Sequence, residues 1–282
     1  MMSRRWTQVK QGMKHSRPAQ CSLAVLVLFA LASLSAFFSP WDPNQMSLQA
    51  RMLPPDTGHW FGTDEYGRDY FTRALYGGQI SLMVGFLAML FSTLIGTLVG
   101  TVSGYFGGKI DNLLMRLVDI LMSIPAFFLL LVLNAYLKPG IANIILIISA
   151  LTWMNMSRLV RAETLTLKER EYVVYARASG EHPLLIIARH IIPNILPTII
   201  VAATLNIASA ILMESTLSFL GLGVQQPNAS WGSMLNNAQS YIGEASWLAM
   251  FPGVLILLTV LSFNVLGDVF RTAFEPGANR DE

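Results

Sequence analysis

The residues of this sequence that could do chemistry with a partner gather in one polar stretch between two apolar runs, residues 171–194, which reads EYVVYARASGEHPLLIIARHIIPN. Its first half favours a short helix over 171–179 that ends at Gly180. Pro183 favours the start of a second helix and Pro193 its end, because proline fits the first turn of a helix and disrupts the interior. The stretch predicts two short helices joined by a turn.

The chemistry that such an element offers is binding to another protein. Tyr172, Val173, Val174 and Tyr175 are predicted to be exposed on its first helix. Apolar and aromatic side chains are unfavourable in a loop surrounded by water, and they suit a groove on a partner. The alternative is a helix that lies on the membrane surface.

Three ionisable residues in apolar runs are further candidates, because a charge inside a membrane span is costly. Arg116 and Asp119 lie near the start of the third run, where an i, i+3 pair can neutralise itself. They form either an anchoring or interhelical salt bridge or part of a gate. Glu214 ends the fifth run, and it is either a gate residue or the start of an external loop with turns at Gly221 and Gly223.

Enzymatic motifs are absent from the sequence. It contains no GxxxxGK[ST] phosphate loop and no HExxH, CxxC or GxSxG pattern. The histidines are scattered, and the lone Cys21 cannot form an internal disulfide. We expect no enzyme, no metal site and no cofactor, so a partner or an ion gradient must supply any energy.

The composition indicates a polytopic membrane protein, since 53% of the residues are hydrophobic, 13% are charged and the mean hydropathy is +0.50. None of the long apolar runs alternates in polarity as the strands of a membrane barrel do, which leaves helices. The sequence therefore predicts an all-α fold with six transmembrane helices, at 22–38, 80–102, 113–137, 141–156, 195–213 and 247–266.

Orientation follows from basic residues at the span ends, which are retained on the cytoplasmic side. Basic residues precede the first span and follow the fourth, whereas the segment after the first span carries five acidic residues. We expect both termini in the cytoplasm. The expected divisions are a tail at 1–21, the first span at 22–38, an external insert at 39–79, a five-helix core at 80–268 with a cytoplasmic loop at 158–194, and a tail at 269–282. A cleaved signal peptide is the alternative for the first run.

Two features of the core concern helix packing. Gly96, Gly100 and Gly104 recur every four residues and predict a close helix contact within or between chains, with a glycine-lined passage as the alternative. Pro125 predicts a kink in the third span. In the insert, GTDEYGRDYFTRALYGG at 62–78 favours an amphipathic helix near the surface, which either caps the bundle or contacts a partner that delivers substrate.

Six stretches make the sequence similar to the inner-membrane permeases of ABC importers, specifically the second permease of the binding-protein-dependent, type I dipeptide, oligopeptide and nickel group. They are WDPN at 41–44, HWFGTDEYGRD at 59–69, GYFGG at 104–108, MRLVDILMSIP at 115–125, LSFLGLGVQQP at 217–227 and FNVLGD at 263–268. The resemblance covers nearly the whole chain after residue 22, and it implies the type I importer permease fold.

That family carries a loop pattern of Glu-Ala-Ala, three residues, Gly, nine residues and Ile-x-Leu-Pro. Here Ala176, Gly180 and Pro193 match the pattern, whereas Val174 replaces its acidic residue, so we hypothesise that Glu171 substitutes for that carboxylate. The further departures are Tyr175 and His190. The resemblance implies that the residues coupled to an ATPase are Glu171, Tyr172, Val174, Tyr175, Ala176, Arg177, Gly180, Glu181, His182 and Pro193.

The resemblance also implies the partners: a homologous second permease, two cytoplasmic ABC ATPases, an external solute-binding protein and the lipid of a bacterial inner membrane, without nucleic acid. Di- or oligopeptides are the expected solutes, and nickel, other metal chelates or glutathione-like solutes are the alternatives. An ion-coupled transporter or a membrane enzyme would need polar groups near the bilayer centre, and the second and fifth runs contain no ionisable residue there.

Overall fold

The computed structural model describes residues 2–137 and 140–274, and within these ranges the chain is helical and forms no strand, which confirms the all-α prediction. Five helices are long and apolar enough to cross a membrane, and a bent pair can make a sixth span. They are α2 (Arg17–Leu34, extended by a 3-10 turn to Phe38), α3 (Tyr70–Phe106), the pair α4 (Gly108–Ser123) and α5 (Ala126–Tyr136), α6 (Ile141–Leu167), α9 (Ile192–Phe219) and α11 (Trp247–Phe274).

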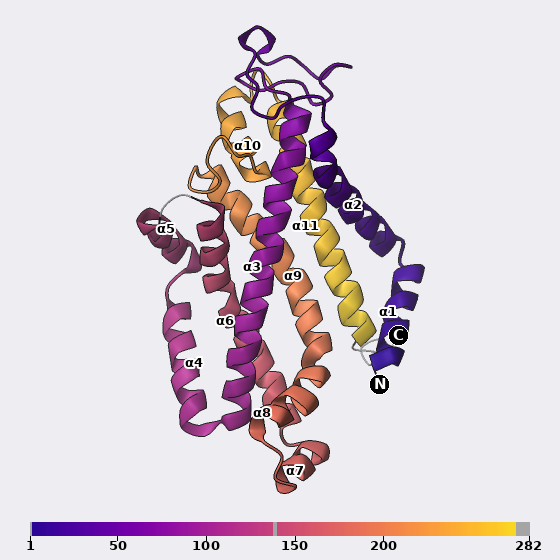
Figure 1. Ribbon diagram of the computed structural model, residues 1–282, viewed down its shortest axis with the longest axis vertical. Helices are drawn as coiled ribbons and strands as arrows, with labels where there is room; N and C mark the ends of the chain where they lie inside the picture. Colours follow the sequence, from indigo (N-terminus) through magenta and orange to yellow (C-terminus); the bar gives the residue numbers. More distant parts are fainter. Residues whose placement is uncertain (1, 138–139, 275–282) are drawn as a thin grey trace.

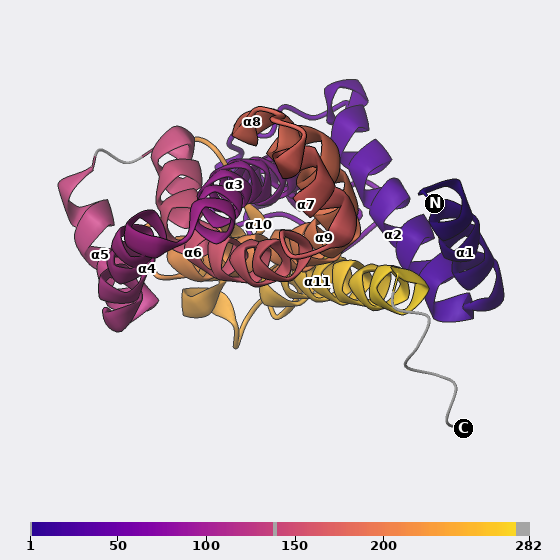
Figure 2. The ribbon, with the colours of Figure 1, turned by 90° about the horizontal axis from the view of Figure 1, so that it is seen from below.

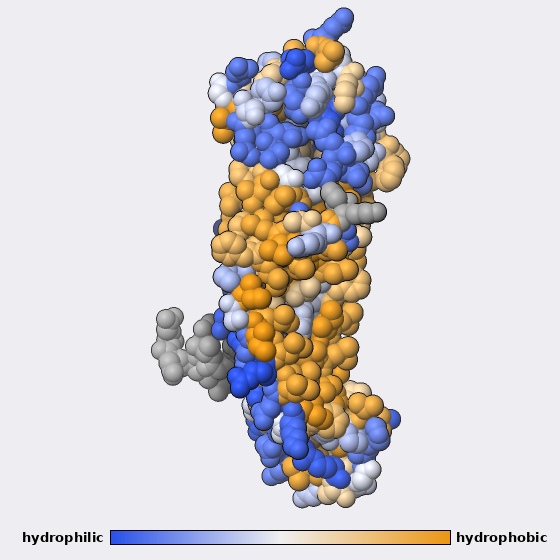
Figure 3. All heavy atoms as spheres, turned by 90° about the vertical axis from the view of Figure 1, so that its left-hand side faces the viewer, coloured by the Kyte–Doolittle hydropathy of each residue, from blue (hydrophilic) through white to orange (hydrophobic). Residues whose placement is uncertain are grey.

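The helices run between two polar ends (Figure 1). At the upper end lies the irregular insert between α2 and α3, and at the lower end lie α7 (Glu171–Ala178) and α8 (Pro183–Ile186). A band of apolar surface separates these ends (Figure 3). Such a band suits a hydrocarbon layer, because polar side chains are costly there. The helical conformation satisfies the backbone hydrogen bonds within each span.

The centre of the bundle is the contact between α3 and α6, which Figure 2 shows beside α9 and α11. A Cβ atom added at Gly96 would lie 2.7 Å from the Trp153 carbonyl oxygen, and one at Gly100 would lie 2.5 Å from that of Ser157. One at Gly104 would lie 2.7 Å from the Thr164 Cβ. The glycine stripe therefore lies in a helix contact within the chain, where any side chain would push the two backbones apart.

The third span is not one helix. α4 and α5 meet at 85°, because Ile124 and Pro125 adopt extended backbone angles between them. Proline disfavours a helical conformation at the residue before it, so the predicted kink is a complete break.

The acidic residues of α4 pair with arginines of α6, so the salt bridge of Asp119 is interhelical and Asp119 does not pair with Arg116. Asp119 pairs with Arg158, and Asp111 forms a bidentate pair with Arg161 at 2.6 and 2.7 Å. Arg116 is exposed and forms no ion pair with the described residues. Sequence spacing identified these groups as costly but could not show that α6 approaches α4.

The outer insert differs from the expected surface helix. α3 starts at Tyr70 and continues without a break into the span, because the Asp69 side chain accepts a hydrogen bond from the Thr72 amide at 2.7 Å and caps the helix there. The preceding residues are irregular. The 62–78 segment is thus half loop and half the outer end of a transmembrane helix.

Two shorter helices complete the structure. α1 (Met2–His15) packs beside the last turns of α11, and α10 (Trp231–Ala238) packs between α3, α9 and α11. α2 begins at Arg17, earlier than the expected span at 22. Of the expected tail at 269–282, residues up to Phe274 belong to α11, and residues 275–282 lie outside the described part of the chain.

Candidate functional site

The inner element, which we define as residues 170–193, begins with α7 and a closed turn. The Glu181 amide donates to the Ala176 carbonyl, and the Gly180 amide donates to the Arg177 carbonyl. These two bonds form a Schellman motif, which requires a residue with positive φ, and Gly180 has φ +79°. Gly180 therefore fixes the direction in which the chain leaves α7.

α7 is anchored through one buried face. Val173 is fully buried against Ile186, Ile187 and Ile191, in a cluster that continues to Tyr105 of α3 and Met156 of α6. The prediction that Val173 is exposed is therefore wrong. Burying an isoleucine-lined contact of this kind contributes about 1.5–3 kcal/mol per large side chain, which holds so short a helix in place.

The second helix does not end at Pro193, contrary to the expectation. α8 continues through a π-helical turn, Ile187–Ile191, directly into α9, so that Pro183–Phe219 forms one span. The Ile192 amide donates to the Ile187 carbonyl, five residues back. Pro193 has no amide hydrogen to donate, and the wider turn before it lets the helix continue, as π-bulges do.

Polar contacts add to this anchor. The Glu181 carboxylate lies 3.1 Å from Nε2 of His190, and the ring centroids of His190 and Tyr172 lie 6.3 Å apart. The Arg177 guanidinium lies over the ring of Tyr105 at 5.4 Å. Glu181 and His190 therefore connect the turn after α7 to the π-helical turn before α9.

The outward face of α7 is exposed. Tyr172, Val174 and Tyr175 are 41%, 47% and 72% exposed. Glu171 is exposed on the first turn, one helical turn before Val174. We define these four residues, Glu171, Tyr172, Val174 and Tyr175, as the docking face. His182 is exposed beyond it and caps α8 through Nδ1, while Ala176 is half-buried beneath it.

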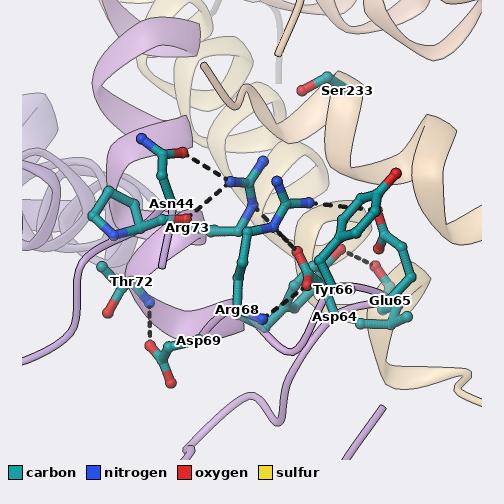
Figure 4. Close-up of polar contacts among 12 residues, drawn as sticks. Asn44, Asp64, Glu65, Tyr66, Arg68, Asp69, Thr72, Arg73 and Ser233 are labelled. Atoms are coloured by element: carbon teal, nitrogen blue, oxygen red, sulfur yellow. Dashed lines mark hydrogen bonds and ion pairs between the residues drawn. The ribbon is translucent and has the colours of Figure 1, made fainter. Parts of the chain in front are cut away.

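A second polar centre lies at the outer end and was not recognised as a unit from the sequence. Asp64, Arg68 and Arg73 are all at most 2% exposed (Figure 4). The Asp64 carboxylate accepts from Nε of Arg68 at 2.6 Å and lies 3.5 Å from Nε of Arg73. Arg73 also donates to the Pro43 carbonyl at 3.0 Å, which joins the WDPN stretch to α3.

Further contacts close this outer ion cluster, which we define as Asp64, Glu65, Arg68 and Arg73. Burial raises the pKa of Glu65, and the nearby Asp64 carboxylate adds to that rise, while Arg68 opposes it. The Arg51 guanidinium donates to the Glu65 carbonyl at 2.7 Å. These charged side chains pair with one another inside the chain. This arrangement supports the prediction that the insert is a structural cap rather than a surface that contacts a substrate-delivering partner.

Glu214 lies inside the bundle and before the end of its helix. It is fully buried in α9, which continues beyond it to Phe219. Its carboxylate accepts hydrogen bonds from Ser81 at 3.0 Å and from Ser218 at 2.7 Å. The following stretch makes a second Schellman turn at Gly221, φ +78°, before α10.

Comparison with known proteins gives one family. The family model described as "Binding-protein-dependent transport system inner membrane component" matches residues 93–280. The dipeptide transport system permease protein DppC of Bacillus subtilis (strain 168) is 42% identical over 270 residues, which are 95% of this chain and 84% of that protein. The oligopeptide transport system permease protein OppC of Escherichia coli (strain K12) is 41% identical over 275 residues, 96% of this chain and 91% of that protein.

A solved structure shares the fold. A chain of the MetNI methionine ABC transporter in an inward-facing conformation, in its CY5 native crystal form, aligns with a TM-score of 0.59 and 22% identity. The alignment covers 71% of this chain and 96% of that chain. It supports the type I importer permease fold expected from the sequence.

Replacing Asp64 with alanine should destabilise the outer end strongly, because the buried Arg73 would lose its carboxylate and Arg68 would keep only Glu65, at 3.4 Å. Breaking a buried pair from one side costs about 3–5 kcal/mol. Thermal unfolding of the detergent-purified protein measures the effect. Glu244→Ala, an exposed carboxylate at the same end, is the matched control and should leave the midpoint unchanged. Equal midpoints for the two variants would contradict a structural role for the cluster.

Proposed function

The chain belongs to the family of binding-protein-dependent transport system inner membrane components, and on that premise we propose that its inner element is the part that couples it to an ATPase. The observation that carries the proposal is the docking face, an apolar and aromatic surface on a helix that is rigidly anchored beneath. The protein is the permease subunit of an importer, and ATP hydrolysis belongs to partner chains.

The geometry supports a lever. Val173 and the Glu181–His190 pair join α7 to the start of a helix that continues from Pro183 to Phe219, 37 residues. At 1.5 Å per residue such a helix is about 55 Å long, more than the thickness of the hydrocarbon core. We call the helix Pro183–Phe219 the rod. A docked ATPase that displaces α7 would therefore move a rod that crosses the whole membrane, and this movement would drive alternating access.

The remaining partners follow from the family. We propose a homologous second permease, two cytoplasmic ABC ATPases and an external solute-binding protein, with the chain in a bacterial inner membrane. The basic ends of α1, α2 and α6 favour the cytoplasm for the end that carries α7, and hence for both termini. The coupling loop is shorter than the expected 158–194, because α6 continues to Leu167.

Peptides are the proposed solutes. The Bacillus subtilis and Escherichia coli relatives are named for dipeptide and oligopeptide transport, and each aligns with more than nine tenths of this chain. No feature of the described residues favours a second solute class.

Replacing Tyr175 with glutamate should prevent docking, because it puts a charge at the most exposed apolar or aromatic residue of the docking face. The loss of a central aromatic contact costs about 2 kcal/mol or more, roughly 30-fold in Kd. Co-purification of the ATPase and ATP-dependent uptake into vesicles measure it. Ile242→Glu, at a similarly exposed apolar residue of the opposite end, is the control. Full ATPase retention by the Tyr175 variant would refute the assignment of this face.

Replacing Glu171 with alanine tests whether it stands in for the carboxylate missing at Val174. A charge at the rim of an interface chiefly affects association rate and salt dependence. We expect ATPase binding to weaken by about 2- to 5-fold at low salt, in line with an exposed ion pair, and the difference to shrink at high salt. Glu169→Ala, exposed just before α7, is the control. Unchanged transport and ATPase coupling would remove the role of Glu171 and leave the docking helix in place.

Uptake of a labelled dipeptide by intact cells should fall to background when this protein is deleted and return when it is restored. A free amino acid taken up by a separate system is the control for membrane energisation. Dipeptide uptake that does not change on deletion would exclude dipeptides as the solute.

A further inference from the structure

A carboxylate is buried in the outer half of the bundle, and its hydrogen-bond partners come from two helices. Glu214 of α9 is 0% exposed. It accepts from Ser81 of α3 and from Ser218 of its own helix. We call Glu214 with these two serines the Glu214 cluster.

The two serines that donate to Glu214 also accept hydrogen bonds from backbone amides. The Trp231 amide, at the start of α10, donates to Oγ of Ser81 at 3.3 Å. The Val224 amide donates to Oγ of Ser218 at 3.0 Å. Glu214 thus orients the hydroxyls that hold both ends of the 224–231 segment, which makes it the centre of a network and not an isolated charge.

The surrounding glycines show that α10 sits directly on the neighbouring backbone. A Cβ atom at Gly232 would lie 2.6 Å from the Ser215 Cα, and one at Gly223 would lie 2.5 Å from the Ser218 Cα. The indole of Trp231 is 1% exposed and donates to the Ala74 carbonyl at 2.9 Å. Because no empty space separates α10 from the end of α9, a displacement of α9 must also displace α10.

From these contacts we propose that Glu214 is a positioning residue that fastens α10 to the outer end of α9, so that α10 follows the rod that α7 moves. The inference rests on the proposed coupling role of α7. It places Glu214 outside the solute pathway, since its carboxylate is enclosed by the chain's own helices. A hydrogen-bonding role predicts that glutamine substitutes for it and alanine does not, because an amide can still bond to the serines.

The docking of α10 can be measured without transport. Ala238 is 1% exposed at the end of α10, so Ala238→Cys in a Cys21→Ser background reports whether α10 is seated. A membrane-impermeant maleimide should react about 10-fold faster or more after Glu214→Ala, and at the original rate after Glu214→Gln. Thr259→Ala is the control, since its buried hydroxyl bonds only to the Leu255 carbonyl of its own helix. Slow labelling in the alanine variant, or equally fast labelling with glutamine, would overturn the proposal.

Transmission is measured in the assembled importer. Gln225 is exposed in the segment held by Ser218, so a cysteine in its place can react with the maleimide. When Glu214 is present, Gln225→Cys should be labelled at different rates with and without ATP. After Glu214→Ala, the two rates should be the same. Glu214→Gln should restore the difference. A difference that persists in the alanine variant would overturn the positioning role alone. No difference in the chain with Glu214 would instead refute the lever, whatever the labelling rate at position 238.

Discussion

The apolar contact beneath α7 is the interaction on which the functional part of the structure depends. Eight residues are too few to form a stable helix in water, so α7 exists because Val173 is buried among Ile186, Ile187 and Ile191. Those isoleucines belong to the same unbroken helix that crosses the membrane. The contact therefore does two things at once: it stabilises α7 as a helix and it fixes α7 to the span Pro183–Phe219.

The chain treats its charges according to their position. At the outer end, Asp64, Arg68 and Arg73 are buried in a satisfied cluster that shapes the irregular insert. In α4, the acidic groups are paired across to α6, which ties the broken span to the bundle at one end. Glu214 accepts hydrogen bonds from the neutral hydroxyls of Ser81 and Ser218, and this suits a site far from bulk water where a second charge would need its own desolvation.

The sequence predicted the number and place of the apolar helices well, because length and composition decide whether a segment can cross a bilayer. It did not predict contacts between residues that are far apart in the sequence. The pairing of Asp119 with Arg158 joins residues 39 apart, and the bond from Ser81 to Glu214 joins residues 133 apart. Val173 was placed on the wrong face because all four residues from Tyr172 to Tyr175 are apolar or aromatic, so one helical turn has no polar side to orient it. The continuity through Pro193 depends on a π-helical turn that leaves no mark in the residue pattern.

Two of the three departures from the family's loop pattern, Val174 and His190, are consistent with each other in this structure. Val174 makes the docking face less charged, and His190 brings a polar ring to a position where the pattern expects isoleucine. The ring is half-buried, so it needs a partner, and Glu181 lies 3.1 Å away and supplies one. The imidazole that His190 introduces is thus hydrogen-bonded inside the element, to Glu181 in the turn after α7. The exposed face of α7 consists mainly of aromatic and apolar side chains. The contacts that anchor α7 do not include Val174, which is exposed, so the loss of the family's acidic residue at 174 leaves them unchanged.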